Sequence, residues 1–393
     1  MVTYAVGPSL DSFTGVPNTL MLLAVMGLFG ALLVVAVLLG LNSRPGRHAR
    51  TRPHRNAFGG RDQVTPRRKR AAIIVNPTKF EDLAAVVTTV GEVAATLGWD
   101  PPLVVETTQT DPGAGQARSA LDEGVDLVCS LGGDGTVRMV ASALAGTSTP
   151  LGLLPGGTGN LLARNLELPV TDIAEAFRVA CTGRNRAVDV GYLTLQDASA
   201  PGGYPAPEGS TTPEGSAEHA FLVMAGIGLD ATIMSETTEA AKARMGWPAY
   251  AATGLRNFLG PRLKAHISID DGAPTPVQAH TVLIGNCGRI TGGINLIPDA
   301  RVDDGILDVV VIAPKGLAGW LNVSAQVLTQ HRSARTQRLQ RHTATRVTVT
   351  TEKPQAVQLD GDIVGESSAL SARIEPKALL VRVATMGDPP PAG

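Results

Sequence analysis

The stretch Leu127-Val128-Cys129-Ser130-Leu131-Gly132-Gly133-Asp134-Gly135-Thr136 decides the fold class of this 393-residue chain. An apolar segment runs directly into three glycines and an aspartate, and residues that favour a helix follow. Glycine adopts backbone angles that other residues avoid and lets the main chain come close to a ligand. The start of the next helix offers unpaired N–H groups and the positive end of its dipole, which together suit phosphate. The pattern predicts a phosphate-binding turn between a strand and a helix, with a tight turn lacking any ligand as the alternative.

Two common nucleotide-binding motifs do not fit this turn. A Walker A loop needs the pattern G-x-x-x-x-G-K-[ST], which does not occur here. A Rossmann fingerprint needs G-x-G-x-x-G spacing, whereas Asp134 stands inside this turn. We therefore expect a nucleotide site of another type.

A second glycine turn follows the next apolar segment. Leu151–Leu154 is typical of a buried strand, and Pro155-Gly156-Gly157-Thr158-Gly159-Asn160 leads into the helix-like Leu161–Leu166. Two such units in succession would place both turns at the carboxyl ends of neighbouring parallel strands, where ligands bind in open α/β sheets. Asn160 is equally well explained as a helix cap or turn residue.

The pattern of apolar residues predicts two domains. Strands and helices alternate through residues 71–186, which indicates a doubly wound α/β sheet covered by helices. The predicted strands there are 71–75, 103–107, 127–131 and 151–154, and the predicted helices are 82–97, 116–123, 137–144, 161–166 and 172–180. From 187 to 370 the pattern changes to strands separated by turn signals, which predicts a mainly antiparallel β domain. Those strands are expected at 187–195, 219–225, 264–269, 277–286, 307–312, 346–351 and 356–359, with a last one at 379–383. Residues 196–218 are rich in Pro, Gly, Ser and Glu and are expected to form a disordered insert.

The N-terminal segment has the features of a membrane anchor. Residues 20–41 carry no charge and are long enough to span a bilayer core of about 30 Å as a helix. The linker 42–70 contains a single acid, Asp62, and many basic residues: Arg44, Arg47, Arg50, Arg52, Arg55, Arg61, Arg67, Arg68, Lys69 and Arg70. The positive-inside rule then predicts residues 1–19 outside the cell and the following domains in the cytoplasm, with the linker against anionic headgroups. A start extended by misannotation and a removed targeting segment are the alternatives.

Composition is that of an ordinary globular enzyme. Hydrophobic residues make up 44% of the chain, and a net charge of −1 argues against nucleic acid as a partner. Cys129, Cys181 and Cys287 show neither metal-binding spacing nor a disulfide framework, so we expect reduced thiols.

The two glycine turns, with further motifs in the same order, resemble the diacylglycerol kinase catalytic family, which comprises lipid kinases and is distantly similar to the NAD kinases. The further motifs are Asn76-Pro77, Thr107-Thr108, Gly226-Ile227-Gly228-Leu229-Asp230-Ala231, Pro298-Asp299-Ala300, Asp303-Asp304-Gly305-Ile306-Leu307-Asp308 and Leu359-Asp360-Gly361-Asp362. The similarity runs from about Arg70 to Val383. It implies an α/β ATP-binding domain to which residues 371–385 return, and a β-sandwich lipid-substrate domain.

The resemblance also implies which residues bind the nucleotide and which one acts as general base. The implied nucleotide contacts are Asn76, Thr107 or Thr108, Gly132, Gly133, Asp134, Gly135, Thr136, Thr158 and Asn160. Asp360 is the implied general base, placed in a turn after a strand, where its carboxylate could accept the proton of the attacking hydroxyl. From local sequence alone, Asp360-Gly361 is equally well explained as a hairpin turn.

A metal site is implied in the loop from Arg301 to Ile306. In the resembled family a carboxylate that matches Asp304, with main-chain oxygens that match Arg301 and Ile306, holds a structural Mg²⁺. Such hard oxygen ligands suit this ion. Because Asp and Gly are ordinary turn residues, a plain turn is the alternative.

Four positions depart from the family pattern. Arg138-Met139 stands where the family often has Asn-Glu, Leu161 replaces an acid, and Asp362 stands where Glu is usual. These changes leave metal binding and the turnover rate undecided.

The expected activity is ATP- and Mg²⁺-dependent phosphorylation of a membrane lipid, with diacylglycerol as the favoured acceptor. A sphingoid base, ceramide or another lipid alcohol, then NAD, are the alternative acceptors, and a nucleotide or lipid sensor without turnover is the non-enzymatic one. The resemblance leaves room for a homodimer.

Overall fold

The fold is described from a computed structural model for residues 67–196, 218–228, 262–290, 295–314, 319 and 339–385. The predicted membrane span 20–41 lies outside these ranges, as do nearly all of the linker 42–70 and of the insert 196–218. Within the described ranges, no helix combines the length and the apolar composition needed to cross a membrane. All the described residues belong to one compact unit.

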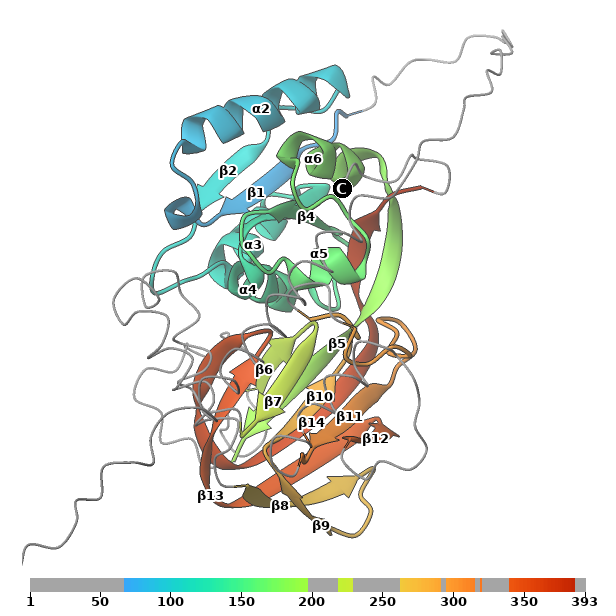
Figure 1. The fold of residues 1–393 in the computed structure, drawn as a ribbon. Coiled ribbons are helices and arrows are strands. Elements are labelled where there is room, and N and C mark those ends of the chain that lie inside the picture. The colour runs from blue at the N-terminus through green and yellow to red at the C-terminus, as the bar shows by residue number, and fades with distance from the viewer. Residues whose placement is uncertain are drawn as a thin grey trace, which may run out of the picture. The chain divides into compact units, whose positions relative to one another are not determined.

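The first part of this unit is a parallel sheet with helices on both faces (Figure 1). Its strands are β1 (Ala71–Val75), β2 (Leu103–Glu106), β3 (Leu127–Gly132) and β4 (Leu151–Pro155), in the order β4-β3-β1-β2. Its helices are α2 (Leu83–Thr96), α3 (Ala114–Asp122), α4 (Asp134–Leu144), the short α5 (Leu161–Asn165) and α6 (Ile173–Thr182). The predicted α/β class is therefore confirmed, although α4 already begins at Asp134 instead of Val137.

Strand β1 explains why both faces of the sheet are covered. Alternate side chains of a strand point to opposite faces. Ala71, Ile73 and Val75 pack in a hydrophobic cluster with α2 and α6, whereas Ala72 and Ile74 pack in another cluster with α3, α4 and α5. A strand buried on both faces must be apolar throughout, as β1 is.

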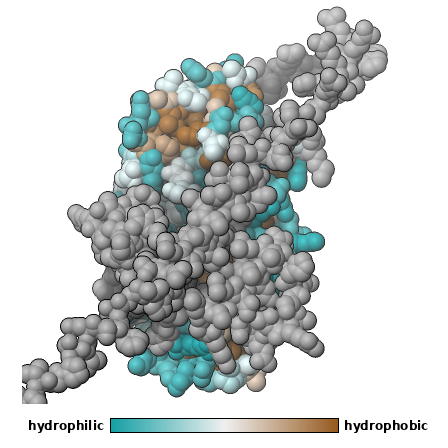
Figure 2. All heavy atoms as spheres, viewed as in Figure 1, coloured by the Kyte–Doolittle hydropathy of each residue, from teal (hydrophilic) through white to brown (hydrophobic). Residues whose placement is uncertain are grey.

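Helix α2 keeps part of its apolar surface near solvent. Leu83 and Val86 are only half-buried, whereas Val90 and Ala94 are fully packed against the sheet. Figure 2 shows apolar residues gathered over the end of the molecule that carries this helix. The inner face of α2 thus contributes to the core while its first turns remain partly exposed.

The second part of the unit is mainly antiparallel. Its strands are β5 (Arg184–Leu195), β6 (Glu218–Phe221), β7 (Met224–Ile227), β8 (Leu263–Ile269), β9 (Thr275–Ala279), β10 (Thr281–Gly285), β11 (Leu307–Ile312), β12 (Leu339–Ala344), β13 (Arg346–Leu359) and β14 (Asp362–Val383). The order β12-β11-β10-β7-β13-β14 continues directly into β4, because Val381 of β14 pairs with Leu151 in parallel. The strands of both parts therefore belong to one hydrogen-bonded sheet.

Several strand limits differ from those predicted. The expected strand 219–225 is interrupted at Leu222 and Val223, which gives β6 and β7. The expected strands 346–351 and 356–359 are one strand, β13, with an irregularity between Thr350 and Gln355. The expected strand 379–383 is the end of the 22-residue β14.

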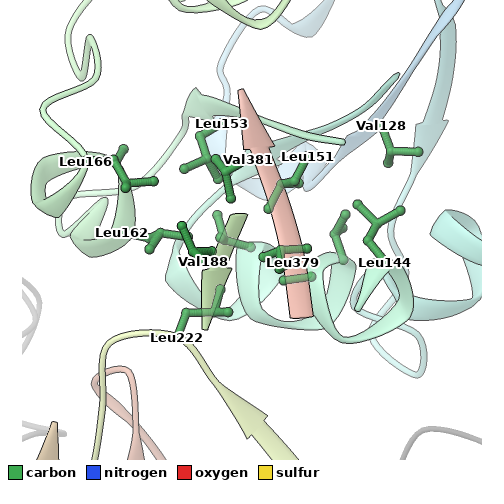
Figure 3. Packing of buried hydrophobic residues seen from close by; sticks show 14 of the residues in the cluster. Val128, Leu144, Leu151, Leu153, Leu162, Leu166, Val188, Leu222, Leu379 and Val381 are labelled. Carbon is green, nitrogen blue, oxygen red and sulfur yellow. The ribbon is translucent and has the colours of Figure 1, made fainter. Parts of the chain in front are cut away.

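One hydrophobic cluster joins the two parts of the unit. It contains Leu144 of α4 and Leu151 of β4 together with Val188 of β5, Leu222 and Leu379 of β14 (Figure 3). All five side chains are at most 3% exposed. Because helices and strands of both parts share this core, the glycine turns and the antiparallel strands are held in fixed relation to each other.

Candidate active site

The two glycine turns lie side by side at one edge of the parallel sheet. Gly132, the last residue of β3, pairs with Pro155, the last residue of β4. A Cβ atom built on Gly156 would lie 2.8 Å from the Cα and N atoms of Gly132, and one on Gly157 would lie 2.8 Å from Cα of Gly133. The turns therefore meet at the carboxyl ends of neighbouring strands, as expected.

The reason for glycine in these turns differs from the one predicted. None of Gly132, Gly133, Gly156 and Gly157 has a positive φ angle. The unusual backbone angles expected for glycine in the first turn are therefore not found at Gly132 and Gly133. Gly156 and Gly157 are required because a side chain on either would collide with the main chain of the first turn, at Gly132 and Gly133. A side chain on Gly132 would instead collide with Thr136.

Asp134 ties the first turn to the helix that follows the second. Its Oδ1 accepts a hydrogen bond of 2.6 Å from the amide of Leu161, and its carboxylate also lies against Gly159. Burial, followed by the charges of Asp360 and Asp362, raises the pKa of Asp134 to about 6, although the bond from Leu161 lowers it. A carboxylate with a raised pKa beside two others is typical of functional sites.

The remaining predicted nucleotide contacts line the same edge and also have structural partners. Asn76 follows β1, and its Oδ1 accepts bonds from the amide and hydroxyl of Thr78. Thr107 is buried after β2. Thr108 uses its hydroxyl to accept the amide of Asp111. The Asn160 side chain, 8% exposed, bonds to both the N–H and the C=O of Gly157, so it braces the second turn.

The two other threonines of the turns lie in different surroundings. Thr136 is 4% exposed and packs beneath Gly132, where a Cβ atom would come within 2.7 Å of its hydroxyl. Thr158 is exposed at the tip of the second turn. Lys79, which the sequence did not single out, is also exposed, and its Cε lies 3.9 Å from the position of a Cβ on Gly133. Its charge therefore lies beside the first turn.

Asp360 occupies the hairpin between β13 and β14. Asp360 and Gly361 have φ angles of 50° and 96°, the left-handed values of a two-residue hairpin turn. The side chain does not project into solvent, because Asp360 is only 4% exposed. The geometry of Asp360 is thus compatible both with a plain hairpin turn and with a catalytic role.

Main-chain amides hold the Asp360 carboxylate. Oδ1 accepts bonds from Val223 at 2.8 Å, Met224 at 3.0 Å and Leu222 at 3.3 Å, and Oδ2 accepts one from Leu222 at 3.0 Å. These amides come from the interruption between β6 and β7, where the backbone donors face the hairpin. Burial raises the pKa of Asp360, while the Arg138 charge and the three amides oppose that rise.

The interruption at Leu222 and Val223 is itself anchored by Asn286. This side chain is 1% exposed and donates from Nδ2 to the carbonyls of Leu222 at 2.9 Å and Asp189 at 3.1 Å. The main-chain N–H of Asn286 also donates to the carbonyl of Val223. Asn286 therefore fixes the peptide groups that in turn fix Asp360.

The predicted metal residues share one loop. The Oδ1 of Asp304 accepts the amide of Ile306 at 3.2 Å, and Arg301 lies at the start of the loop. Burial, with the charges of Asp189 and Asp303, raises the pKa of Asp304. Asp189 accepts the amide of Gly305, and Asp303 pairs with Arg186. Within the described ranges no three His, Cys, Asp or Glu side chains gather closely enough to hold a metal. The ligand set implied by the resemblance contains one such side chain, the Asp304 carboxylate, together with the main-chain oxygens of Arg301 and Ile306.

Two contributors to the site carry little or no sequence signal. The amides of Leu222, Val223 and Met224 are backbone groups, which no residue pattern reveals. Arg138 offers a signal, since a charged residue stands among the apolar positions of a predicted helix beside Val137 and Ala141. A charge on a buried helix face implies a buried partner.

Comparison with known proteins agrees with the geometry. The model of the diacylglycerol kinase catalytic domain matches residues 70–193, and that of the YegS C-terminal NAD kinase beta sandwich-like domain matches residues 222–383. Residues 70–193 therefore belong to the diacylglycerol kinase catalytic-domain family. The first match covers the glycine turns, and the second covers Asp360 with the amides that hold it.

Three relatives are 27%, 28% and 31% identical to the chain over the segments that match. A diacylglycerol kinase from Bacillus subtilis is 27% identical over 76% of this chain and 91% of its own length. A "Probable lipid kinase YegS-like" protein from Cronobacter sakazakii is 31% identical over 50% of this chain, and an uncharacterized protein from Synechocystis is 28% identical over 65%. The match spans only 60% and 54% of these last two relatives.

A solved structure shares the fold. The crystal structure of a diacylglycerol kinase from Bacillus anthracis superposes with a TM-score of 0.58 at 22% identity, covering 81% of this chain and 98% of that one. The arrangement of a parallel sheet followed by a mainly antiparallel part is thus the family fold. Membership of a kinase family implies the use of ATP.

Proposed function

We propose that this protein transfers the γ-phosphoryl group of ATP to the hydroxyl of a membrane lipid, with diacylglycerol as acceptor and phosphatidic acid as product. The observation that carries the proposal is the meeting of two glycine turns with a buried carboxylate held by amides. Asp134 of the first turn and Asp360 are near enough for the charge of one to affect the pKa of the other. The names of the relatives from Bacillus subtilis and Cronobacter sakazakii support a lipid as the acceptor class.

The first glycine turn supplies the phosphate-binding side. Gly133 precedes α4, and within 4 Å of a Cβ built there lies only the Cε of Lys79. The absence of a side chain therefore leaves room beside the helix start, where N–H groups and the Lys79 ammonium favour an anion. Thr158 on the exposed tip of the second turn faces the same edge of the sheet. These groups would bind and orient the nucleotide phosphates.

Asp360 would accept the proton of the lipid hydroxyl. The hydroxyl oxygen forms a bond to the γ-phosphorus, the bond from that phosphorus to the bridging oxygen of ADP breaks, and the proton passes to Asp360. Oδ1 of Asp360 accepts three amide bonds and Oδ2 accepts one, so Oδ2 keeps capacity for the proton. Burial favours the protonated form of Asp360, which makes the carboxylate a stronger base than one in water.

Mg²⁺ is proposed as the metal of this reaction, where it neutralises phosphate charge when bound. Asp304, with the main-chain oxygens of Arg301 and Ile306, would hold a structural ion in the loop before β11. The acidic neighbours Asp189 and Asp303, which raise the pKa of Asp304, would favour a cation there.

Attachment to a membrane is proposed from the sequence of the N-terminal segment. The uncharged run 20–41 would anchor the protein, and the basic residues of 42–70 would lie on anionic headgroups, with the kinase on the cytoplasmic side. Confinement to the surface raises the effective concentration of a lipid acceptor.

The test is transfer of radiolabel from ATP by the full-length protein in mixed micelles containing Mg²⁺. Diacylglycerol, ceramide, sphingosine and NAD are offered separately, and Asp360→Asn is measured beside the wild type. We expect labelled phosphatidic acid, with a rate about 10²- to 10⁴-fold lower in the variant because the proton acceptor is lost.

Asp270→Asn is the matched control. Asp270 also has a positive φ angle and accepts main-chain amides, from Thr345 and Arg346, but it lies in another turn. Its variant should keep the wild-type rate. Label in a different lipid would replace the acceptor, label only in NADP would contradict the lipid kinase, and ATP binding without transfer would indicate a sensor.

A further inference from the structure

Arg138 joins the first glycine turn to the hairpin of Asp360. It belongs to α4, the helix that begins at Asp134, and only 4% of it is exposed. Its Nη1 donates to the carbonyl of Leu359 at 2.9 Å, and its Nη2 donates to Oδ2 of Asp362 at 3.2 Å. Leu359 and Asp362 are paired residues on either side of the Asp360–Gly361 turn. One guanidinium therefore holds both ends of the turn that carries the general base.

A second contact between the same elements lies at the start of α4. A Cβ atom on Gly135 would come within 2.7 Å of Oδ2 of Asp362. The first turn of the helix and the beginning of β14 thus lie against each other. Since α4 carries the phosphate-binding turn at its N-terminus and Arg138 one turn later, its position sets the separation between the bound phosphates and the hairpin.

The charge of Arg138 also matters inside the site. The charges of Asp360 and Asp362 raise the pKa of Asp134, and the charge of Asp360 raises that of the Cys287 thiol. The guanidinium of Arg138 lowers the pKa of Asp360 and supplies the positive charge among these groups. His219 of β6 faces Arg138, and its pKa is lowered by burial and by that charge. A buried cation beside three carboxylates favours the ionised form of the base.

We propose that Arg138 is a positioning residue for phosphoryl transfer: it clamps the Asp360–Gly361 hairpin to the helix of the phosphate-binding turn. The inference rests on the proposed kinase function. Because Arg138 is buried, it acts through Asp360 and Asp362 and not on the substrates. Its loss should therefore lower kcat and leave the KM for ATP nearly unchanged.

The experiment compares kcat, the KM for ATP and the pH profile of kcat in the full-length protein, using the lipid acceptor found above. For Arg138→Gln we expect kcat to fall about 10- to 100-fold, as expected for a misplaced catalytic group. The acidic limb of the profile should move to higher pH, since loss of the cation raises the pKa of Asp360. Arg138→Lys keeps the charge but cannot donate from two nitrogens to Leu359 and Asp362. It should therefore restore the acidic limb of the pH profile but only part of kcat.

Asp362→Asn distinguishes the loss of the contact that holds the hairpin from the loss of the positive charge of Arg138. This variant breaks the same pair at its more exposed end, where the Asp362 side chain is 42% exposed. It should also lower kcat, but it removes a negative neighbour of Asp360 and should move the acidic limb to lower pH. Opposite shifts for the two variants are the signature that a merely structural role would not produce.

Arg178→Gln is the control for loss of a guanidinium, since Arg178 pairs at the surface with Glu175 within α6. It should behave as wild type. Wild-type kcat and pH profile in both Arg138→Gln and Asp362→Asn would overturn the proposal while leaving the kinase function intact. If Arg138→Gln does not fold, Arg138→Lys and Asp362→Asn decide the question. A wild type that transfers phosphate to no acceptor would overturn the kinase function and this role with it.

Discussion

Burial of the Asp134 carboxyl lowers the free energy of unfolding when this group is ionised, so the effect depends on pH. Its pKa is about 6 in the folded protein, raised mainly by burial, and 3.8 without these surroundings. The folded state therefore binds more protons between these two values. The stabilisation that protonation gives is fully present below the unfolded pKa and is lost as pH rises through about 6.

Asp134→Asn is expected to remove this cost. The amide oxygen of Asn can still accept the bond from Leu161, but it carries no charge. Without nucleotide or metal, the variant should be more stable than the wild type at pH 7.5, by at most about 3 kcal/mol for two pKa units. The difference should shrink toward pH 5 in urea denaturation measured at both values.

The control for this prediction is Asp172→Asn, which also stands at a helix start but is exposed. A pH-independent difference between Asp134→Asn and the wild type would contradict the assigned pKa. A variant that is more stable and less active would show that the site retains Asp134 for function at the expense of stability.

At the scale of elements, the two glycine turns form a pair of touching main chains. Gly157→Ala places a methyl group against Cα of Gly133, so one turn must move. We expect weaker ATP binding, because the displaced turn is the one proposed to bind the phosphates. Isothermal titration calorimetry with ATP measures the loss.

Gly91→Ala provides the comparison for Gly157→Ala. Gly91 lies within α2, and no atom comes within 4 Å of a Cβ built there. This substitution should leave ATP binding unchanged and raise the free energy of unfolding by about 0.5–1 kcal/mol, as Gly-to-Ala changes do in helices. Equal ATP affinity in Gly157→Ala and Gly91→Ala would show that the contact between the turns does not matter.

Elements whose apolar residues follow a clear pattern were predictable from sequence. The points at which the antiparallel strands continue or break were not. The apolar runs of β1, β3 and β4 and the turns after them follow from local pattern and glycine chemistry. The interruption at Leu222 and Val223 lies in an unbroken apolar sequence, so nothing local marks it. It depends on distant partners, since Asn286 and Asp360 bond to its peptide groups.

The candidate site shows the same division. Side chains such as Asp360 and Asp134 could be chosen by motif, because type and order are visible in the sequence. The role proposed for Arg138 could not, since it depends on contacts with Leu359 and Asp362 more than 200 positions away along the chain. The two glycine turns meet at one sheet edge as expected, but Gly156 and Gly157 are required by contact between main chains, which the sequence does not reveal.

At the scale of the whole molecule, the shared core predicts cooperative unfolding. Leu379 is fully buried in the cluster that joins α4 and β4 to β5. Leu379→Ala should lower the free energy of unfolding by about 2–5 kcal/mol, the usual effect of such a cavity. Far-UV circular dichroism and intrinsic fluorescence should follow one shared transition, shifted as a whole.

Leu380→Ala, at the next and only half-buried position, is the comparison and should cost less. Two separate transitions in the wild type, or a shift in only one of them for Leu379→Ala, would show that the two parts unfold independently despite the continuous sheet.

The pairing of β14 with β4 also constrains how the protein is made. Strand β4 has only β3 and β14 as neighbours in the sheet, and β14 is the last described element to leave the ribosome. The edge of β4 that pairs with β14 therefore stays unpaired while residues 156–361 are synthesised. Such an edge is where nascent chains associate wrongly. Successful production in a foreign host should therefore depend on slow translation or on chaperones that shield that edge until the last strand arrives.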